Sequence, residues 1–356
     1  MTQHHTAENN KVTIHFGGPG FGEGILVSIG DRILLGIDCP KSFILNPDAT
    51  GSFLDKQIRL LQGEKQIYWL LTHYHLDHFQ LLDAVLERYS DLITSFVHPA
   101  DYTAEDFRYL MGESTRSAGY KKSEAIKARS AYVRLREQMS REAVRAISRT
   151  ITSPGETWIS MTLRTKNVGL KKLRVSVFSP PPAMMEKIMG SELKRLMSGD
   201  TRKQHSRSIA NYSSYIVFLS FGNFEALFLN DAPLSRTENV NWKEVGINRG
   251  LSLLKVANHG SLNGTSPQLL ESLEGKEYVE GRKAIIAPNR HHGFPQEEVI
   301  KMLKNAGYEV LVSGQKRASK REKEALELES REMGVKINVF DAHRSGDDII
   351  TLEFEA

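Results

Sequence analysis

Apolar runs of four to six residues, separated by Gly, Pro, Asn and Asp, recur along most of this chain. Runs of this length between turn residues are typical of β-strands. The segments predicted as strands are residues 12–16, 25–29, 33–37, 66–71, 92–97, 174–179, 215–219, 226–229, 253–257, 284–287, 337–340 and 349–354. Apolar residues at helical spacing predict helices over residues 79–86, 267–273 and 296–306. The mixture of strands and helices predicts an α+β fold.

The pattern changes between residues 104 and 150, where apolar positions fall at helical spacing and no proline interrupts them. We predict one domain over residues 1–356, with a helical insertion over residues 104–150 and a charged helical insertion over residues 315–335. Between residues 105 and 149 there are eleven Lys or Arg and six Asp or Glu. Most of these charges fit a solvated helix face. The alternatives are a basic lid over an anionic substrate and a surface that binds a protein partner.

The composition is that of an ordinary globular protein, with 40% hydrophobic residues, 25% charged residues and a formal charge of +4. So mild a positive charge permits a polyanionic partner without requiring one. The one cysteine, Cys39, excludes an internal disulfide framework and fits a reducing compartment, so we expect a cytoplasmic protein. No apolar run has the length of a membrane span, and residues 1–10 lack the apolar core of a signal peptide. Nothing in the sequence indicates the oligomeric state.

The residues best suited to metal binding or catalysis follow the predicted strand over residues 66–71. They are His73, His75, Asp77 and His78, three imidazoles and one carboxylate. This mixture of ligands suits zinc, manganese or iron. In extended backbone His73 and His75 point the same way, whereas Asp77 and His78 lie past the turn into the next helix. The spacing favours two ions a few ångströms apart, an arrangement that hydrolyses esters.

Several other predicted strands also end at a histidine or an aspartate. These residues are Asp38, His98, Asp231, His259 and His292. Metal-binding and catalytic groups commonly collect at the strand ends of layered αβ scaffolds. We therefore expect these side chains to converge with residues 73–78 on one site.

The order of these residues resembles that of a known superfamily. Residues 72–78 match the signature Thr-His-x-His-x-Asp-His of the metallo-β-lactamase superfamily. Later segments resemble the branch that contains competence-type DNA-uptake nucleases and related phosphodiesterases. These segments are Asn211–Ser214, Asp231, Lys255–Ser261 and Asn289–His292. The resemblance implies a four-layer αββα metallo-β-lactamase sandwich.

The resemblance also implies a site for two divalent metal ions. Zinc is the expected metal and manganese is the alternative. His73 and His75 would hold one ion, Asp77 and His78 would hold the other, and Asp231 would bridge the two.

The chain departs from the branch at Asn258, where the branch has a histidine, and His259 is the expected substitute ligand. The remaining ligand of the first ion is His98 or His205, and we favour His98 because it ends a strand. Asp38 has two interpretations that both stay open. It either supports a ligand histidine, as the resemblance implies, or is a turn residue before a proline.

The expected activity is hydrolysis of a phosphodiester by a water activated between two ions, with a nucleic acid or a nucleotide as substrate. Asp77 would orient or deprotonate this water, and His259 or His292 would protonate the leaving oxygen. One alternative is a hydrolase of carboxyl esters, thioesters or lactams. A second alternative is a non-catalytic scaffold or effector subunit that binds a partner through residues 104–150.

Overall fold

The fold is described from a computed structural model of the chain. The structure describes residues 11–17, 23–39, 43, 52–100, 122–151, 153, 155–165, 169–181, 190, 206–238, 240–247, 249–275, 279–288, 294–313, 336–337 and 349–356. The predicted helical insertion over residues 315–335 lies outside these ranges, as do His205 and His292.

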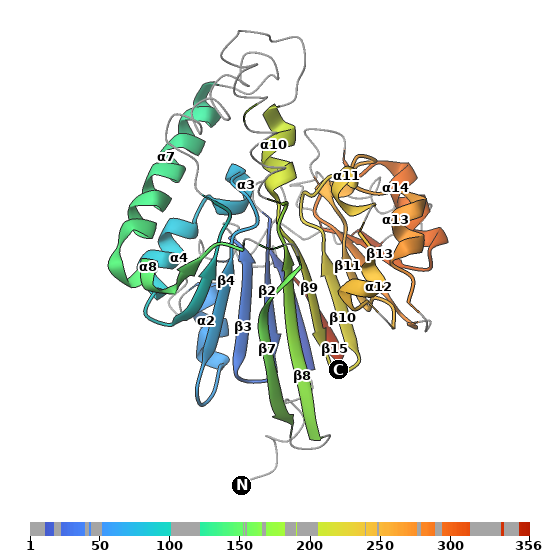
Figure 1. The fold of residues 1–356 in the computed structure, drawn as a ribbon, viewed down its shortest axis with the longest axis horizontal. Coiled ribbons are helices and arrows are strands. Elements are labelled where there is room, and N and C mark those ends of the chain that lie inside the picture. Colours follow the sequence, from blue (N-terminus) through green and yellow to red (C-terminus); the bar gives the residue numbers. More distant parts are fainter. Residues whose placement is uncertain are drawn as a thin grey trace, which may run out of the picture.

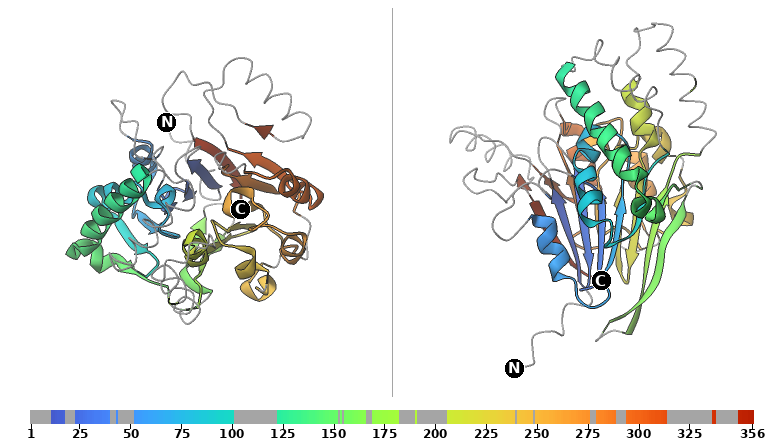
Figure 2. Two further views of the ribbon diagram at one scale, coloured as in Figure 1. Left: turned by 90° about the horizontal axis from the view of Figure 1, so that it is seen from above. Right: turned by 90° about the vertical axis from the view of Figure 1, so that its left-hand side faces the viewer.

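The chain forms two β-sheets that face each other (Figures 1 and 2). Among the described residues the first sheet has the strand order β15-β1-β2-β3-β4-β5-β6, and the second has the order β14-β13-β12-β11-β10-β9-β8-β7. The strands of the first sheet are β1 (Lys11–Gly17), β2 (Gly24–Ile29), β3 (Ile33–Asp38), β4 (Gln66–Leu70), β5 (Ile93–Val97), β6 (Ser148–Arg149) and β15 (Ile349–Glu355). The strands of the second sheet are β7 (Glu156–Thr165), β8 (Gly169–Phe178), β9 (Ile216–Phe221), β10 (Phe224–Phe228), β11 (Leu253–Lys255), β12 (Lys283–Ile286), β13 (Glu309–Val312) and β14 (Lys336–Ile337).

Apolar side chains that alternate along the strands fill the space between the sheets. On β1 the inward residues include Val12 and Ile14, and on β8 they are Leu173, Val175 and Val177. Successive side chains of a strand point to opposite faces, so alternation gives each sheet one apolar inner surface. Fully burying one Val, Leu or Ile side chain contributes roughly 1.5–3 kcal/mol. The core between the sheets therefore provides the stability that holds the polar strand ends in place.

Helices cover the outer face of each sheet (Figure 2). On the first sheet, Trp69 and Phe96 pack among the apolar side chains of four helices, and on the second sheet, Leu254 and Ile286 do the same with three others. The first set is α2 (Phe53–Leu60), α4 (Leu82–Tyr89), α7 (Lys122–Ser140) and α8 (Glu142–Ile147), and the second is α12 (Trp242–Val245), α13 (Pro267–Ser272) and α14 (Glu297–Asn305). Three further short helices are α3 (Leu76–Phe79), α10 (Ser206–Ser213) and α11 (Leu234–Thr237). The predicted four-layer αββα sandwich is confirmed.

Each sheet contains a block of parallel strands, and these two blocks position the site. In the first sheet β3, β4 and β5 run parallel, and in the second β10, β11, β12 and β13 do. The carboxyl ends of parallel strands meet at the same edge of a sheet, so the segments that follow them collect there. Figure 1 shows this edge at the top of the strands, next to α3, with α7 and α10 extending beyond it.

Some elements differ from the sequence prediction. The helix expected over residues 79–86 is two helices, α3 and α4, and the sequence analysis did not predict α2, β7 or β13. Helix α2 begins at a capping box, in which the Ser52 Oγ accepts the backbone N–H of Asp55 and the Asp55 carboxylate accepts that of Ser52. On β7 apolar and polar residues alternate, which breaks up the apolar run that marks a buried strand. None of the helices in the described ranges has both the length and the apolarity that a membrane span requires.

Candidate metal centre

Ligand-type side chains from both sheets meet at the edge where the parallel strands end. The first sheet contributes His73, His75 and His78 from the segment after β4. The second sheet contributes Asp231 after β10 and His259 after β11. The strand ends of two facing sheets thus converge on one region.

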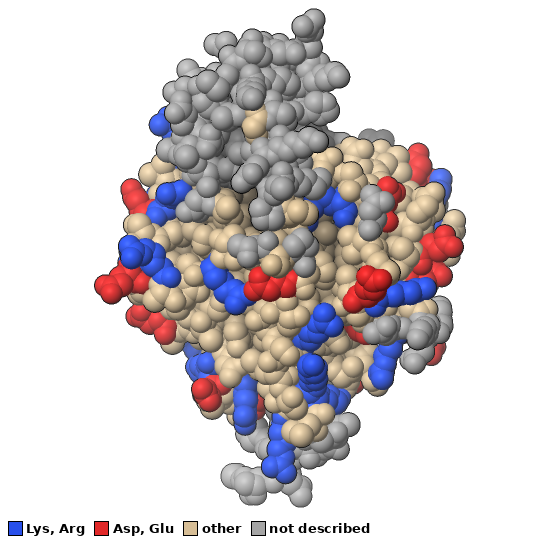
Figure 3. Space-filling model, viewed as in Figure 1, with Lys and Arg blue, Asp and Glu red and all other residues tan. Residues whose placement is uncertain are grey.

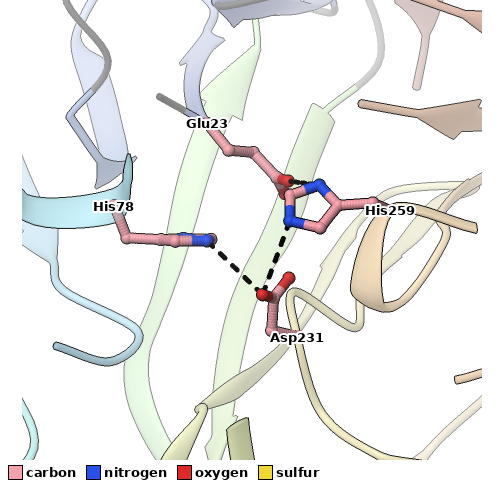
Figure 4. Close-up of side chains that lie close together, drawn as sticks. All are labelled: Glu23, His78, Asp231 and His259. Atoms are coloured by element: carbon pink, nitrogen blue, oxygen red, sulfur yellow. Dashed lines mark ion pairs between the residues drawn. The ribbon is translucent and has the colours of Figure 1, made fainter. Parts of the chain in front are cut away.

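These side chains form two groups that share one carboxylate. We call them the His73 cluster (His73, His75 and Asp231) and the His78 cluster (Glu23, His78, Asp231 and His259, Figure 4). Within each cluster the ligand atoms lie within 4.8 Å of one another. Every member of the His78 cluster is buried, whereas His75 of the His73 cluster is half-buried. The two clusters therefore differ in the number of donors and in access to solvent.

Asp231 lies at the centre of both clusters. Its Oδ2 is 3.7 Å from the Nε2 atoms of His73, His78 and His259. Burial alone raises the pKa of Asp231, but its electrostatic interactions with His259, His78, His73 and Lys255 outweigh burial and hold this pKa well below its usual range. A carboxylate that stays ionised between three imidazoles is well placed to bridge two cations.

Asp38 orients two of these imidazoles. The Nδ1–H of His78 donates to Asp38 Oδ2 at 2.7 Å, and the Thr72 hydroxyl donates to the same oxygen at 2.7 Å. The Nδ1 of His73 lies 3.0 Å from the Thr72 Oγ1, which accepts its hydrogen. Each Nδ1 is thereby used as a donor, which directs the lone pair of Nε2 to the centre of the site; the Nε2 of His73 lies 3.0 Å from the Nδ1 of His75, the second imidazole of its cluster. Of the two interpretations of Asp38, the structure supports the residue that orients ligand histidines.

The third imidazole is oriented in the same way by the backbone. His259 Nδ1 lies 2.9 Å from the carbonyl oxygen of Ala287, at the end of β12, and donates its hydrogen there. Its Nε2 faces Asp231 (Figure 4). His73, His78 and His259 therefore all present Nε2 to one carboxylate.

The electrostatics of the two histidines after β4 are opposite. Burial and the nearby charges of His78 and His75 lower the pKa of His73 well below its usual value, so this ring stays neutral. Burial also lowers the pKa of His78, but the carboxylates of Asp38, Asp77 and Asp231 outweigh it and raise this pKa to about 10. The surroundings of His78 therefore favour a positive charge, which a divalent cation on Nε2 would supply in place of a proton.

The backbone is strained at the same strand ends. Among the described residues, the non-glycine residues with positive φ are Asp38, Asn230, Asn258 and His259, with φ between 46° and 59°. Such conformations cost on the order of 1–3 kcal/mol each and persist where surrounding contacts fix them. Here all four residues adjoin or belong to the ligand set, which indicates that the fold maintains the ligand geometry against local backbone preference.

The loop that carries Asp231 is fixed by a half-buried arginine. The Arg236 guanidinium donates to the carbonyl oxygens of Phe178, Tyr212 and Ser214. The Ser214 Oγ in turn accepts the backbone N–H of Asp231 at 3.2 Å. The end of β8, the segment before β9 and the loop after β10 are thus joined, so Asp231 is rigidly placed.

The donors fit a divalent metal. The His78 Nε2 and the Asp231 Oδ1 are buried and have no hydrogen-bond partner among the described residues. A buried polar atom without a partner costs free energy, and coordination to a cation would satisfy both atoms. Imidazole nitrogens and carboxylate oxygens are the ligand set of zinc and manganese sites.

The structure places the other predicted site residues as follows. Asp77 lies at the rim, with its Oδ2 3.8 Å from His259 Nε2 and its side chain 31% exposed. His98 belongs to neither cluster; its ring stacks on Phe96 and its Nδ1 lies 2.8 Å from the carbonyl oxygen of Pro99. The backbone N–H of Asn258 donates to the Asn230 carbonyl at 2.8 Å. The predicted catalytic residue His292 lies outside the described ranges.

Two buried residues of this region, Glu23 and Lys255, were given no role from the sequence, although Lys255 begins the segment Lys255–Ser261. Glu23 directly precedes β2, and its carboxylate faces His259 (Figure 4). Lys255 is the last residue of β11 and forms an ion pair with Glu23. A single glutamate in a glycine-rich loop carries no spacing signal. A lysine that ends an apolar strand just before a ligand histidine is a signal that could have been used.

No family model matches the chain, and no curated protein matches it. Solved structures do match. One is a metallo-β-lactamase fold protein, YhfI from Bacillus subtilis, at 12% identity and a TM-score of 0.38 over 97% of this chain and 100% of that one. Another is a putative metal-dependent hydrolase from Parabacteroides distasonis, at 12% identity and a TM-score of 0.36 over 81% of this chain and 88% of that one. A third, the hydrolase AbOPH of the β-lactamase superfamily, is 11% identical with a TM-score of 0.32 over 62% of this chain and 71% of that one. At these values the similarity carries no information about substrate.

Proposed function

We propose that this protein is a metal-dependent hydrolase that cleaves phosphodiesters with a water activated between two divalent ions. The observation that carries the proposal is the convergence of His73, His78 and His259 on Asp231, each with Nε2 facing the same carboxylate oxygen. A purely structural network would satisfy its own buried polar atoms, and this one does not. Zinc is the metal we propose, with manganese as the alternative.

The chemistry of such a pair of ions is well defined. When bound, they would acidify a shared water towards a pKa of about 7 and stabilise the negative charge that develops on the substrate. Asp231, whose Oδ2 lies 3.7 Å from the Nε2 atoms of His73, His78 and His259, would help to hold both ions. The same chemistry serves phosphorus and carbonyl centres, so the metal site alone does not select the substrate.

We assign the proton transfers to two described residues. Asp77 is partly exposed at the rim and close enough to the cluster to orient the attacking water or accept its proton. His259 is held by Ala287 and faces the same space, so it can be a ligand or, if a substrate displaces it, a proton donor to the leaving oxygen. The proposed role of His292 as the leaving-group acid stays a prediction.

The preference for a phosphodiester rests on the sequence. The order of the segments from Thr72 to His292 resembles that of DNA-uptake nucleases and related phosphodiesterases. The charge of the face shown in Figure 3 adds little, because basic and acidic side chains are interspersed over its described part. A nucleic acid or a nucleotide is therefore the proposed substrate.

An activity screen tests this proposal. Protein reconstituted with Zn²⁺ or Mn²⁺ would be assayed with bis-p-nitrophenyl phosphate and with p-nitrophenyl acetate, and Asp231→Asn is the matched control. We expect metal-dependent cleavage of the phosphodiester that the substitution abolishes. Faster cleavage of the acetate would favour the carboxyl ester hydrolase. Bound metal without turnover of either substrate, together with capture of a protein partner, would favour the scaffold.

A further inference from the structure

Glu23 is a buried carboxylate to which the proposed mechanism gives no role. It is 5% exposed and lies directly before β2, in the segment that faces the ligand loop. Its backbone N–H donates to the carbonyl oxygen of Asp77 at 2.8 Å, which joins this segment to the ligand loop after β4. Glu23 is thus fixed from two sides within reach of the metal-binding side chains.

The contacts of the Glu23 carboxylate leave it able to bind a cation. Its Oε1 forms an ion pair with Lys255, and its Oε2 lies 3.4 Å from His259 Nδ1. Apart from the ion pair with Lys255, neither oxygen accepts a hydrogen bond from a described residue. A carboxylate has about four acceptor positions, so most of its capacity is unused.

Lys255 explains how a carboxylate can be buried at this position. The lysine is 1% exposed, and its Nζ also donates to the carbonyl oxygen of Asn230 at 3.1 Å. Burying a single charge is costly unless a partner compensates for it. The lysine therefore holds the Glu23 carboxylate in place beside the cluster.

Glu23 also belongs to the only fully buried ligand group among the described residues. Its ligand oxygen lies within 4.8 Å of ligand atoms on His78, Asp231 and His259 (Figure 4). Asp77, the aspartate of the sequence motif, is more exposed and is not part of this group. Two imidazoles and two carboxylates are a complete donor set for a four-coordinate ion.

We propose that Glu23 is a metal ligand, so that the His78 cluster encloses its ion with four protein side chains. The His73 cluster supplies three ligands and leaves a position open. The two sites would then have different roles: the ion with three protein ligands would hold the activated water in its open position, and the ion with four would reach that water only as a fifth ligand. The ion of the His73 cluster would face the substrate, and the ion of the His78 cluster would fix Asp231. This inference rests on the proposed metal chemistry but not on the choice of substrate.

A double-mutant cycle in the whole chain tests whether Glu23 is a metal ligand. The variants are Glu23→Gln, Lys255→Met and the double variant, and the readouts are bound Zn²⁺ per chain and affinity in competition with a chelator. We expect Glu23→Gln to lower the affinity for one of two ions by more than the roughly 10- to 100-fold that residues behind a ligand contribute. The double variant should bind that ion as weakly, because the lost ligand is still missing. Lys255→Met should bind both ions.

If Glu23 serves only to neutralise Lys255, removing both restores the affinity to within about threefold of the unsubstituted protein. That result, or two ions bound normally by Glu23→Gln, would overturn the proposal. Should the variants not fold, crystals of the unsubstituted protein soaked in Zn²⁺ decide the matter. A Glu23 oxygen at about 2.0–2.2 Å from the ion supports the proposal, and one that remains on Lys255 alone contradicts it. A protein that binds Zn²⁺ through Glu23 yet cleaves no phosphodiester would refute the proposed function only.

Discussion

The His73 cluster and the His78 cluster share Asp231 but are otherwise unequal. The His73 cluster takes both of its imidazoles from one segment of the first sheet, and His75 is half-buried. The His78 cluster is fully buried and draws on both sheets, with Glu23 from the first and His259 from the second. An ion in either cluster would join the sheets through Asp231, but one in the His78 cluster would bind two side chains of each sheet, whereas one in the His73 cluster would be more accessible. Two metal sites built on one carboxylate can thus serve stability and reactivity separately.

The largest effect is expected where the two clusters meet. Asp231→Asn removes the charge that both ions require, so we expect both ions to be lost at micromolar metal. Hydrolytic kcat/KM should fall by about 1000-fold, or about 4 kcal/mol of transition-state stabilisation. Metal analysis and kinetics on the same sample check this. Retention of either ion at normal affinity would show that Asp231 does not bridge.

A pair of substitutions separates the clusters. His73→Gln and His259→Gln should each leave one ion per chain and lower kcat/KM by about 100-fold. His259→Gln should lower the stabilisation by Zn²⁺ more than His73→Gln does, because the His78 cluster supplies four buried ligands and the His73 cluster three. Melting temperatures with and without Zn²⁺ measure the difference. Equal losses of stabilisation by Zn²⁺ in both variants would mean that the two clusters contribute equally to the stability of the metal-bound protein.

The pH dependence of the free energy of unfolding in the metal-free protein is a further test of the His78 cluster. The pKa of His78 is raised to about 10 in the folded chain, whereas its usual value is 6.5. Between these values the folded chain binds more protons than the unfolded chain, so the free energy of unfolding should fall as the pH rises from about 6.5 to 10. Below pH 6.5 this contribution is fully present.

Denaturant titrations at pH 6, 8 and 10 after metal removal measure this decline, and His78→Gln should flatten it. Zn²⁺ should flatten it as well, because a ligand imidazole is already deprotonated. A decline that persists in His78→Gln would assign the effect to another group.

The smallest effect is expected from Thr72, which joins His73 to Asp38. Thr72→Val keeps the shape but removes the hydroxyl that accepts the His73 Nδ1–H. We expect about a 10-fold loss of affinity for one ion and little change at the second. Thr72→Ser, which keeps the hydroxyl, is the matched control and should behave normally. A loss in both variants would point to packing instead of hydrogen bonding.

The sequence predicted the parts of this architecture that depend on local pattern. The apolar runs located most strands of both sheets, because buried strands are continuous in sequence. The spacing from His73 to His78 indicated the ligand segment because these residues are also close together in the sequence. Asp231 and His259 were identified because each closely follows a buried strand.

Features that depend on distant contacts were not predicted. Glu23 joins the cluster because the segment before β2 is hydrogen-bonded to Asp77, more than fifty residues later in the chain. The partners of Asp38 are also remote in sequence, and its two interpretations could be separated only by seeing His78 on its carboxylate. Helix α2 was missed although Ser52 and Asp55 form a capping box, because Asp in the last position of that motif is less distinctive than Glu or Gln.

The positive-φ residues at the strand ends also limit how the protein can be engineered. Glycine adopts this backbone conformation most easily, so substituting glycine for Asp38 or Asn258 would be an obvious way to try to raise thermal stability. Glycine at position 38 would remove the acceptor that orients His78 and Thr72. Gains in thermal tolerance are better sought at the opposite ends of the strands, away from the ions.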